Sequence, residues 1–397
     1  MTNASSSASE ASLSSHPLPR EGGRGDGATL SGKAAHDGDH KVAIVGGGPA
    51  GLAMALALHR QGVACEIHDA RDRGAARQDL RILALSHGAR QILEWLGAWQ
   101  AITHTAIDTI HVSQAGGLGM TRLRADEEKV PALGYVLAAG DLAASLDDAV
   151  ATLGIPFHEH HRIQPASPPA AGLTIWAEGA VAAADAVRRD YGQHAVICEA
   201  AAAGPHQGIA WERFTPLGPV ALLPWKQGYA VVMTCAAAEA ERVAGLDTPA
   251  FLAALQERFG NRVHFTVAGP RHVFPLGLRY RPMPVADRQA WIGNAAQTLH
   301  PVAGQGFNLA IRDVFELGRV LAEQPDPGAP EVLARYAAGR RLDRYGAMGF
   351  TDLLVRLFSN DNPLLHHLRG AGLLALDLLP PARSFIARRM MFGARGW

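Results

Sequence analysis

Between residues 41 and 70 the spacing of apolar positions changes twice. Val42–Val45 is a continuous apolar run of strand length, and apolar residues then recur at helical spacing as far as Gly62. From Val63 to Asp69 apolar and polar residues alternate, which indicates a second strand. The pattern therefore predicts a strand–helix–strand unit at the start of the ordered chain.

Three glycines stand where the first strand meets the helix. Gly46 permits a tight turn, Gly48 lets the backbone approach a pyrophosphate, and Gly51 allows the helix to pack closely on the strand. The helix start attracts negative charge, and Asp69 is placed to accept hydrogen bonds from ribose hydroxyls. Together these parts predict a dinucleotide site that suits FAD or NAD better than NADP.

A second strand-to-helix passage occurs late in the chain. Ala290–Gly293 is predicted to be a buried strand, and apolar spacing predicts a helix from about Phe307 to Leu321. Free N–H groups and the helix dipole favour an anionic or electron-rich group at this second helix start. The edge of a reduced flavin is such a group, and Gly304 and Gly306 would let the backbone approach a flat ring.

The region from Tyr191 to Leu278 has a different pattern. Short alternating runs separated by Pro/Gly turns predict an antiparallel sheet, with one helix at Pro249–Phe259. The segment 107–123 is expected to add a hairpin to this sheet. Four prolines between residues 156 and 169 argue against central strands there.

Composition excludes several classes of function. The 397 residues carry no net charge and are 48% apolar, which fits one or two domains with a sizeable core. No basic block is present, so no nucleic-acid partner is predicted. The three cysteines lack a CxxC pair, which argues against disulfides and thiolate metal sites. No apolar run reaches membrane-spanning length and no secretory pattern is present, so a cytoplasmic location is expected.

Two further segments carry weaker signals. Residues 1–40 are rich in Ser, Gly and Ala and are expected to form a disordered leader, although a start assigned too far upstream would look the same. His158, His160 and His161 follow one another closely, but no acids at ligand spacing follow them. A solvated loop is therefore expected, with no metal site, and His68 is expected to face the adjoining surface.

Four blocks carry a family resemblance: the GGGPAG fingerprint, Asp79–Trp99, Gly208–Trp225 and Ile292–Asp313. In them the chain resembles the ubiquinone-biosynthesis aromatic hydroxylases, FAD-dependent monooxygenases built like p-hydroxybenzoate hydroxylase. The resemblance implies a mixed α/β fold, in which a Rossmann-like FAD-binding domain carries an inserted antiparallel β-sheet substrate domain. The implied boundaries are 41–106, 139–190 and 286–336 for the first domain, 107–138 and 191–285 for the second, and 337–397 for C-terminal helices.

The same resemblance implies roles for individual residues. The implied cofactor-binding residues are Gly46, Gly48, Gly51, Asp69, Arg81, Glu178, Gly179, Asn294, Gly304, Gln305, Gly306, Phe307 and Asn308. Glu178-Gly179 replaces the Asp-Gly pair typical of the family. The implied catalytic residues are His300, Pro301, Gly304 and Gln305, and the implied substrate contacts are Phe214, Pro275 and Leu276. Glu212 and Arg213 would either join the substrate contacts or form an outward ion pair.

The implied reaction is hydroxylation of a polyprenyl phenol by O₂ through a C4a-hydroperoxyflavin. NADPH or NADH would reduce FAD, directly or through a separate reductase. Two alternatives stay open: another FAD-dependent oxidoreductase, such as a prenyl reductase or dehydrogenase, and a non-catalytic flavin-bound scaffold among ubiquinone-biosynthesis proteins. The leucine- and arginine-rich tail from residue 352 would cap a domain or make a peripheral contact with the inner membrane.

Overall fold

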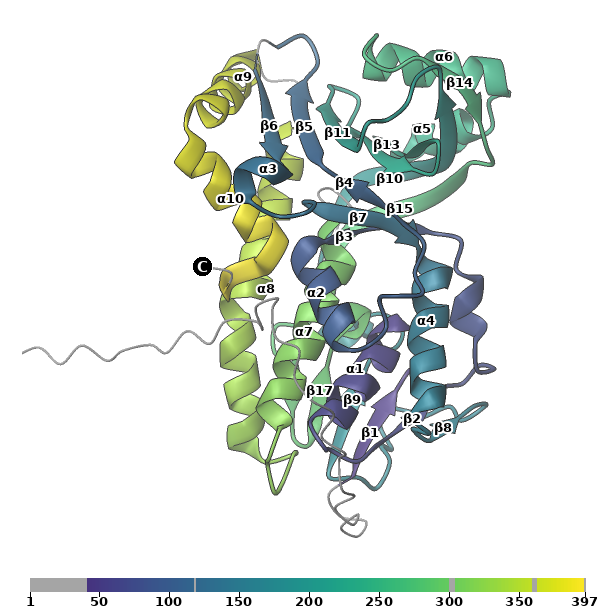
Figure 1. Ribbon diagram of the computed structural model, residues 1–397, viewed down its shortest axis with the longest axis vertical. Helices are drawn as coiled ribbons and strands as arrows, with labels where there is room; N and C mark the ends of the chain where they lie inside the picture. The colour runs from purple at the N-terminus through teal and green to yellow at the C-terminus, as the bar shows by residue number, and fades with distance from the viewer. Residues whose placement is uncertain (1–40, 118, 300–303, 359–362, 396–397) are drawn as a thin grey trace, which may run out of the picture. The chain divides into compact units, whose positions relative to one another are not determined.

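The predicted strand–helix–strand unit is present as β1 (Val42–Val45), α1 (Pro49–Arg60) and β2 (Cys65–His68). It belongs to a six-stranded sheet in which every pair is parallel except the pair at one edge, β16 (Val285–Ala286) with β17 (Gln289–Trp291). The strand order is β16, β17, β9 (Leu173–Trp176), β1, β2 and β8 (Phe157–His158). The computed structural model shown in Figure 1 describes residues 41–117, 119–299, 304–358 and 363–395.

The glycines after β1 have the backbone roles that the pattern predicts. Gly46 has φ of +115°, which an L side chain rarely adopts. A Cβ atom on Gly51 would stand 1.8 Å from the carbonyl oxygen of Gly46. Gly48 precedes α1 in extended conformation and Pro49 takes the first helical turn, where its missing N–H costs nothing. The sequence thus fixes both the turn and the close approach of helix to strand.

A nine-stranded sheet makes up the second layer. Its order is β18 (Gln297–Thr298), β15 (His272–Tyr280), β10 (Val187–Ala202), β13 (Gly228–Ala236), β12 (Val220–Trp225), β11 (Ile209–Phe214), β5 (Thr109–Gln114) and β6 (Met120–Arg124), with β14 (Phe265–Ala268) beside β10. The predicted hairpin β5–β6 does join this sheet.

One pair departs from the expected antiparallel arrangement, because β11 pairs with β5 in parallel. The two strands come from segments almost 100 residues apart, so no hairpin sets their relative direction.

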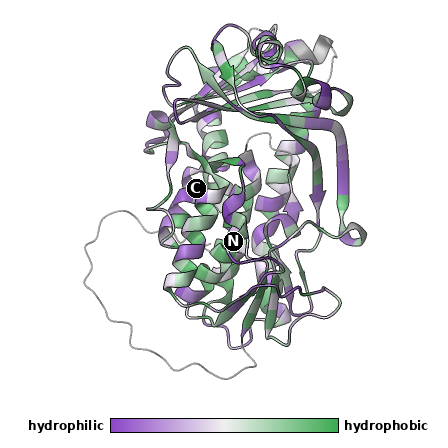
Figure 2. Ribbon diagram, turned by 90° about the vertical axis from the view of Figure 1, so that its right-hand side faces the viewer, coloured by the Kyte–Doolittle hydropathy of each residue, from purple (hydrophilic) through white to green (hydrophobic). Residues whose placement is uncertain are grey.

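The remaining elements cover these two sheets. A three-stranded antiparallel sheet joins β3 (Ile82–Ser86), β7 (Gly134–Ala138) and β4 (His104–Ile107). The shorter helices are α2 (His87–Trp95), α3 (Ala125–Glu128), α4 (Ala139–Thr152), α5 (Ala237–Ala244) and the predicted α6 (Thr248–Phe259). Apolar and polar residues are mixed along most elements in Figure 2, so most have one side to bury. The largest core cluster packs around α1 and the six-stranded sheet, and another lies between the nine-stranded sheet and α5 and α6.

The predicted late helix is α7 (Gln305–Leu321), which begins two residues earlier than expected. In the described part of the chain it is followed by the α-helices α8 (Pro330–Phe358), α9 (Pro363–Leu378) and α10 (Pro380–Phe392). Figure 1 shows α9 beside β6 and α10 beside α3. Among the described helices, none is both long enough and apolar enough to cross a bilayer. The predicted leader lies outside the described residues, and the predicted domain boundaries stay a prediction.

Candidate functional site

A cavity of about 910 Å³ is lined both by the first strand–helix unit and by the nine-stranded sheet. Residues from distant parts of the chain form its walls. Representative lining residues are Gly48 before α1, Asp69 after β2, Ala84 on β3, Ala210 on β11, Gly306 on α7 and Met390 on α10. The cavity therefore joins both helix starts that the sequence singled out.

Asp69 lies buried at the end of the cavity nearest α1. Its Oδ2 accepts hydrogen bonds from the Gly47 N–H at 2.7 Å and from Arg71 Nη2 at 2.9 Å. Its Oδ1 accepts from the Arg71 N–H at 2.8 Å and from Arg71 Nε at 3.1 Å. Burial opposes ionisation of Asp69, but the bonds from Arg71 and Gly47 outweigh it and lower the pKa of the carboxyl. Asp69 thus holds the glycine turn, and its contact with ribose stays a prediction.

Glu178 and Gly179 line the same end of the cavity. Glu178 packs against Gly46, the first glycine of the fingerprint. A Cβ atom built on Gly46 would stand only 2.6 Å from the Cβ of Glu178. Burial and the charge of Asp69 raise the pKa of Glu178, while Arg162 and Arg71 oppose that rise. Glu178 therefore forms part of the cavity wall beside α1, and its contact with a cofactor stays a prediction.

Arg81 and Asn294 both line the cavity, as predicted for cofactor contacts. Arg81 forms a paired contact with Asp79, whose Oδ1 and Oδ2 lie 2.9 and 2.6 Å from Arg81 Nε and Nη2. Asn294 lies in the single turn Gly293–Ala295 that follows β17. Cofactor contact by these two side chains stays a prediction.

The start of α7 forms the opposite end of the cavity. Gly304, Gly306 and Phe307 line it. Gly304 caps the helix in the left-handed conformation, with φ of +60°. No heavy atom lies within 4 Å of the point where a Cβ on Gly306 would stand. Backbone N–H groups at this helix start are thus available to an electron-rich ligand edge.

Asn308 and Gln305 do not line the cavity, and Asn308 has a different part in the structure. Its Oδ1 accepts from the Ser86 N–H at 2.8 Å, and its Nδ2 donates to the carbonyls of Ala84 at 3.0 Å and Gly304 at 2.7 Å. The side chain therefore ties β3 to the start of α7. Gln305 donates from Nε2 to the Met390 carbonyl at 3.5 Å. Cofactor contact by these two residues stays a prediction.

The predicted substrate residues separate into two groups. Phe214 lines the cavity from the end of β11. Pro275 and Leu276 are not among the residues that line it, since β15 places them opposite His194 and Gln193. The predicted catalytic residues His300 and Pro301 lie outside the described residues.

The sequence did not resolve whether Glu212 faces the substrate cavity or the outer surface. From β11 the cavity is lined by Ala210, Trp211, Glu212 and Phe214, whereas the guanidinium of Arg213 lies near Gly260. Of the two alternatives left open for Glu212 and Arg213, the outward ion pair is not formed among the described residues. The Glu212 carboxyl has no hydrogen-bond or ion-pair partner in the part of the chain that the structure describes. Burial raises its pKa to about 7.

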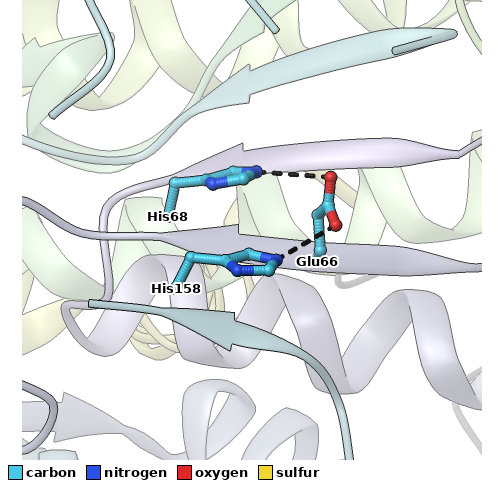
Figure 3. Close-up of side chains that lie close together, drawn as sticks. All are labelled: Glu66, His68 and His158. Atoms are coloured by element: carbon cyan, nitrogen blue, oxygen red, sulfur yellow. Dashed lines mark hydrogen bonds and ion pairs between the residues drawn. The ribbon is translucent and has the colours of Figure 1, made fainter. Parts of the chain in front are cut away.

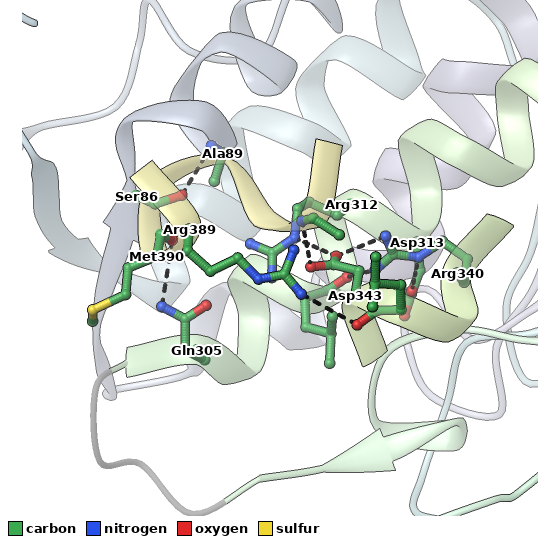
Figure 4. A network of polar contacts seen from close by, with 12 residues as sticks. Ser86, Ala89, Gln305, Arg312, Asp313, Arg340, Asp343, Arg389 and Met390 are labelled. Carbon is green, nitrogen blue, oxygen red and sulfur yellow. Dashed lines mark hydrogen bonds and ion pairs between the residues drawn. The ribbon is translucent and has the colours of Figure 1, made fainter. Parts of the chain in front are cut away.

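A buried charge network holds α7 against α8 behind the cavity (Figure 4). Arg312 Nε lies 2.8 Å from Asp343 Oδ2, and Arg340 Nη1 lies 2.7 Å from the same oxygen. Arg340 Nε also lies 2.7 Å from Asp313 Oδ1. Ser86 and Gln305 in the same view bond to the backbone of α10, which joins the last helix to the cavity wall.

The glycines provide a test of whether a long, partly flat cofactor such as FAD fits this cavity. Gly48 and Gly306 both line it, and no heavy atom lies within 4 Å of a Cβ built on either. A side chain at either position would enter the cavity at a helix start, where a pyrophosphate or a flavin ring approaches the backbone. The residues present therefore fit FAD.

Comparison with known proteins agrees with this geometry. Residues 39–175 and 171–348 match the family described as FAD binding domain. The ubiquinone hydroxylase UbiL of Rhodospirillum rubrum is 31% identical, with 95% of this chain and 96% of that protein covered. The 3-demethoxyubiquinol 3-hydroxylase of Escherichia coli is 29% identical, with 85% and 94% covered.

Solved structures show the same fold at lower identity. PqsL of Pseudomonas aeruginosa, described as a probable FAD-dependent monooxygenase, superposes with a TM-score of 0.70 at 19% identity, covering 85% of this chain and 100% of that chain. The p-nitrophenol 4-monooxygenase PnpA of Pseudomonas putida superposes with a TM-score of 0.68 at 16% identity, covering 89% and 98%. The chain belongs to the FAD-binding family of flavin-dependent monooxygenases, in the group that contains the ubiquinone-biosynthesis hydroxylases.

Proposed function

We propose that this protein hydroxylates the aromatic ring of a polyprenyl phenol in ubiquinone biosynthesis, using O₂ and a nicotinamide donor. The observation that supports the proposal is the carboxyl of Glu212, which has no partner among the described residues and lies on a side of the cavity that is largely apolar apart from Thr121 and Thr234. Ile110, Val112, Leu223 and Val232 surround that side of the cavity. Such a wall accepts an aromatic ring with an isoprenoid chain, and one carboxyl is enough to orient a phenol hydroxyl.

Each part of the chain has a defined task in this proposal. FAD, when bound, supplies the activated oxygen, and Gly48 and Gly306 leave room for it at the two helix starts. The apolar sheet face excludes water from the reacting ring. Glu212 accepts the hydrogen bond of the phenol hydroxyl, which raises the electron density of the ring, and its pKa of about 7 suits exchange of that proton near neutral pH.

The C-terminal helices provide a route for the isoprenoid chain. Leu354, Leu373 and Met390 line the cavity from α8, α9 and α10. The same helices expose a second apolar set, which we call the leucine face: Leu353, Leu368, Leu374, Leu378, Leu379 and Phe385. We propose that a lipid bilayer covers the leucine face, because a polyprenyl substrate resides in the bilayer. A substrate in that bilayer would be separated from the cavity only by the thickness of these helices.

Two arginines of the tail form ion pairs within the protein, so they are not free to bind lipid head groups. Arg383 pairs with Glu127 at 2.9 Å, and Arg388 pairs with Glu128 at 3.2 Å. These pairs fasten α10 to α3, which supports the capping alternative for these two arginines. The proposed membrane contact is therefore apolar in character.

Isotopically labelled O₂ tests the proposed reaction. The purified FAD-loaded protein is mixed with a short-chain prenyl phenol and NADPH or NADH, and the product is analysed by mass spectrometry. One labelled oxygen atom on the aromatic ring is the expected result. Flavin reduction without oxygen transfer would favour another oxidoreductase, and a flavin that no donor reduces would favour a separate reductase or a scaffold.

A further inference from the structure

Two neighbouring strands bring three metal-ligating side chains together beside Asp69 (Figure 3). Glu66 and His68 are two residues apart on β2, so their side chains leave the same face of the sheet. The short edge strand β8 runs parallel to β2 with His158 in register with His68. The acid missing from the histidine-rich segment is thus supplied by Glu66, 92 residues earlier in the chain.

The three side chains converge on one point. Nε2 of His158 lies 3.2 Å from Oε2 of Glu66, and Nε2 of His68 lies 3.4 Å from Oε1 of the same carboxylate. One ligand atom from each residue falls within 4.8 Å of the others. Zinc bonds to His and Glu are about 2.0–2.2 Å long, so tetrahedral ligand atoms lie about 3.3–3.6 Å apart. If the most widely separated ligand atoms move about an ångström closer together, the three residues reach the spacing of a tetrahedral zinc site.

His68 is prepared for this role by its surroundings. It is 5% exposed, contrary to the expectation that it faces the surface. Its Nδ1 lies 3.0 Å from Nδ1 of His161. In the tautomer in which this Nδ1 donates to His161, the Nε2 lone pair faces the Glu66 carboxylate and is available to a metal ion.

We propose that Glu66, His68 and His158 form a binding site for a divalent transition-metal ion, with zinc the ion that this set of nitrogen and oxygen ligands fits best. Lys41 holds one oxygen of Glu66 at 2.5 Å. The metal takes the place of this ammonium group, and the side chain of Lys41, which is 40% exposed, turns to solvent. The fourth ligand is water.

The position of the site indicates what the metal does. The Asp69 N–H donates to the carbonyl of His158 at 3.0 Å, and the His161 N–H donates to the carbonyl of Asp69 at 2.8 Å. A metal held by β2 and β8 therefore clamps the backbone on both sides of Asp69. Zinc acts as a structural clip behind the adenosine end of the cavity, independently of which substrate is hydroxylated.

A second group of side chains nearby offers a matched control. Asp72, Glu159 and His160 also approach one another, but all three are exposed, and His160 already pairs with Asp72 at 3.1 Å. His158→Ala removes a half-exposed ligand of the proposed site. His160→Ala, two residues further along the chain, removes a member of the exposed group instead. Neither replacement empties the core, so both variants are expected to fold.

The experiment measures Zn²⁺ and Co²⁺ binding to the FAD-loaded protein. We expect one Zn²⁺ per chain, and a tetrahedral Co²⁺ absorption at wavelengths beyond the flavin bands. His158→Ala and Glu66→Gln should each weaken Zn²⁺ binding at least about 10-fold. Zn²⁺ should raise the melting temperature of the wild type and of His160→Ala but not of His158→Ala.

Two results would overturn the proposal. Wild-type protein that binds no more Zn²⁺ than His158→Ala would mean that Lys41 and the imidazole hydrogen bonds alone satisfy Glu66. Binding that is lost in His160→Ala and kept in His158→Ala would move the ion to the exposed group. Because every readout is metal content, absorption or melting temperature, none depends on hydroxylase activity.

Discussion

At the scale of single residues, Glu212 links the stability of the protein to pH. Burial raises its pKa from the ordinary 4.5 to about 7. The stability associated with the neutral carboxyl is fully present below pH 4.5 and is lost as the pH rises through about 7. At pH 8 the folded protein holds an ionised carboxyl in an apolar cavity.

Glu212→Gln is therefore expected to raise the free energy of unfolding at pH 8, by at most about 3 kcal/mol, and to change it little at pH 4. Urea unfolding at the two pH values measures the difference. Glu239→Gln, on the exposed pair with Arg242, is the control and should behave alike at both. An equal effect of Glu212→Gln at both pH values would contradict the raised pKa.

Gly48 tests the fit of the cofactor at the same scale. Because a Cβ on Gly48 meets no atom within 4 Å and its φ is −82°, Gly48→Val should leave the melting temperature of the apoprotein almost unchanged. The side chain would occupy the place of the pyrophosphate, and FAD binding should weaken at least about 10-fold. Flavin fluorescence titration measures this. Gly204→Val, also in open space but away from the cavity, should bind FAD normally.

Local chemistry explains why some site residues could be predicted and others could not. Gly46, Gly48 and Gly51 follow from one turn, whose geometry depends on neighbours in the sequence. Period-two alternation predicts that Glu212 and Arg213 point to opposite faces, but the face turned to the cavity depends on the parallel neighbour β5. Glu66 and His158 meet only through strand order, which no local pattern contains.

At the scale of elements, the contact between α7 and α8 depends on Asp343. Burial alone would raise the pKa of this carboxyl, but Arg312 and Arg340 outweigh it and lower the pKa to about 2. Its contribution to stability is present above pH 3.8 and is lost as the pH falls through about 2. The network therefore keeps α7 in place throughout the neutral range.

Asp343→Asn leaves two buried guanidinium groups without their shared carboxylate. We expect a loss of about 3–5 kcal/mol in the free energy of unfolding, measured by urea denaturation at pH 7. Asp326→Asn affects a pair with Arg288 that is about half exposed, and it should cost about 1 kcal/mol or less. Similar losses in the two variants would show that burial does not distinguish the pairs.

The elements themselves were largely predictable, because most have a clear period. The strands β1 and β2 and the helices α1, α6 and α7 match the expected segments within a few residues. The 16 residues of β10 run through a glycine and a charged stretch, and pairing with β13, β14 and β15 maintains the strand where its own sequence would not. Tertiary pairing overrides local preference there.

At the scale of the whole molecule, the leucine face predicts binding to lipid bilayers. The protein should float with phospholipid vesicles, zwitterionic as well as anionic, because the tail arginines Arg383 and Arg388 are already paired. The double variant Leu374→Glu/Leu378→Glu should reduce the floating fraction at least about 10-fold. Leu217→Glu, at an exposed leucine on another surface, should float like the wild type. Wild-type protein that stays off every vesicle would contradict the proposed occupant.

The cavity takes residues from Gly48, early in the described part of the chain, to Met390, near the end of that part. During synthesis on the ribosome, the glycine turn before α1 is the first of these cavity walls to emerge, and the wall carried by α10 is the last. A nascent chain therefore has the fingerprint long before it has a closed chamber for the ring. A stop codon in the last few dozen positions would spare nearly every recognisable motif and still leave that chamber open to water.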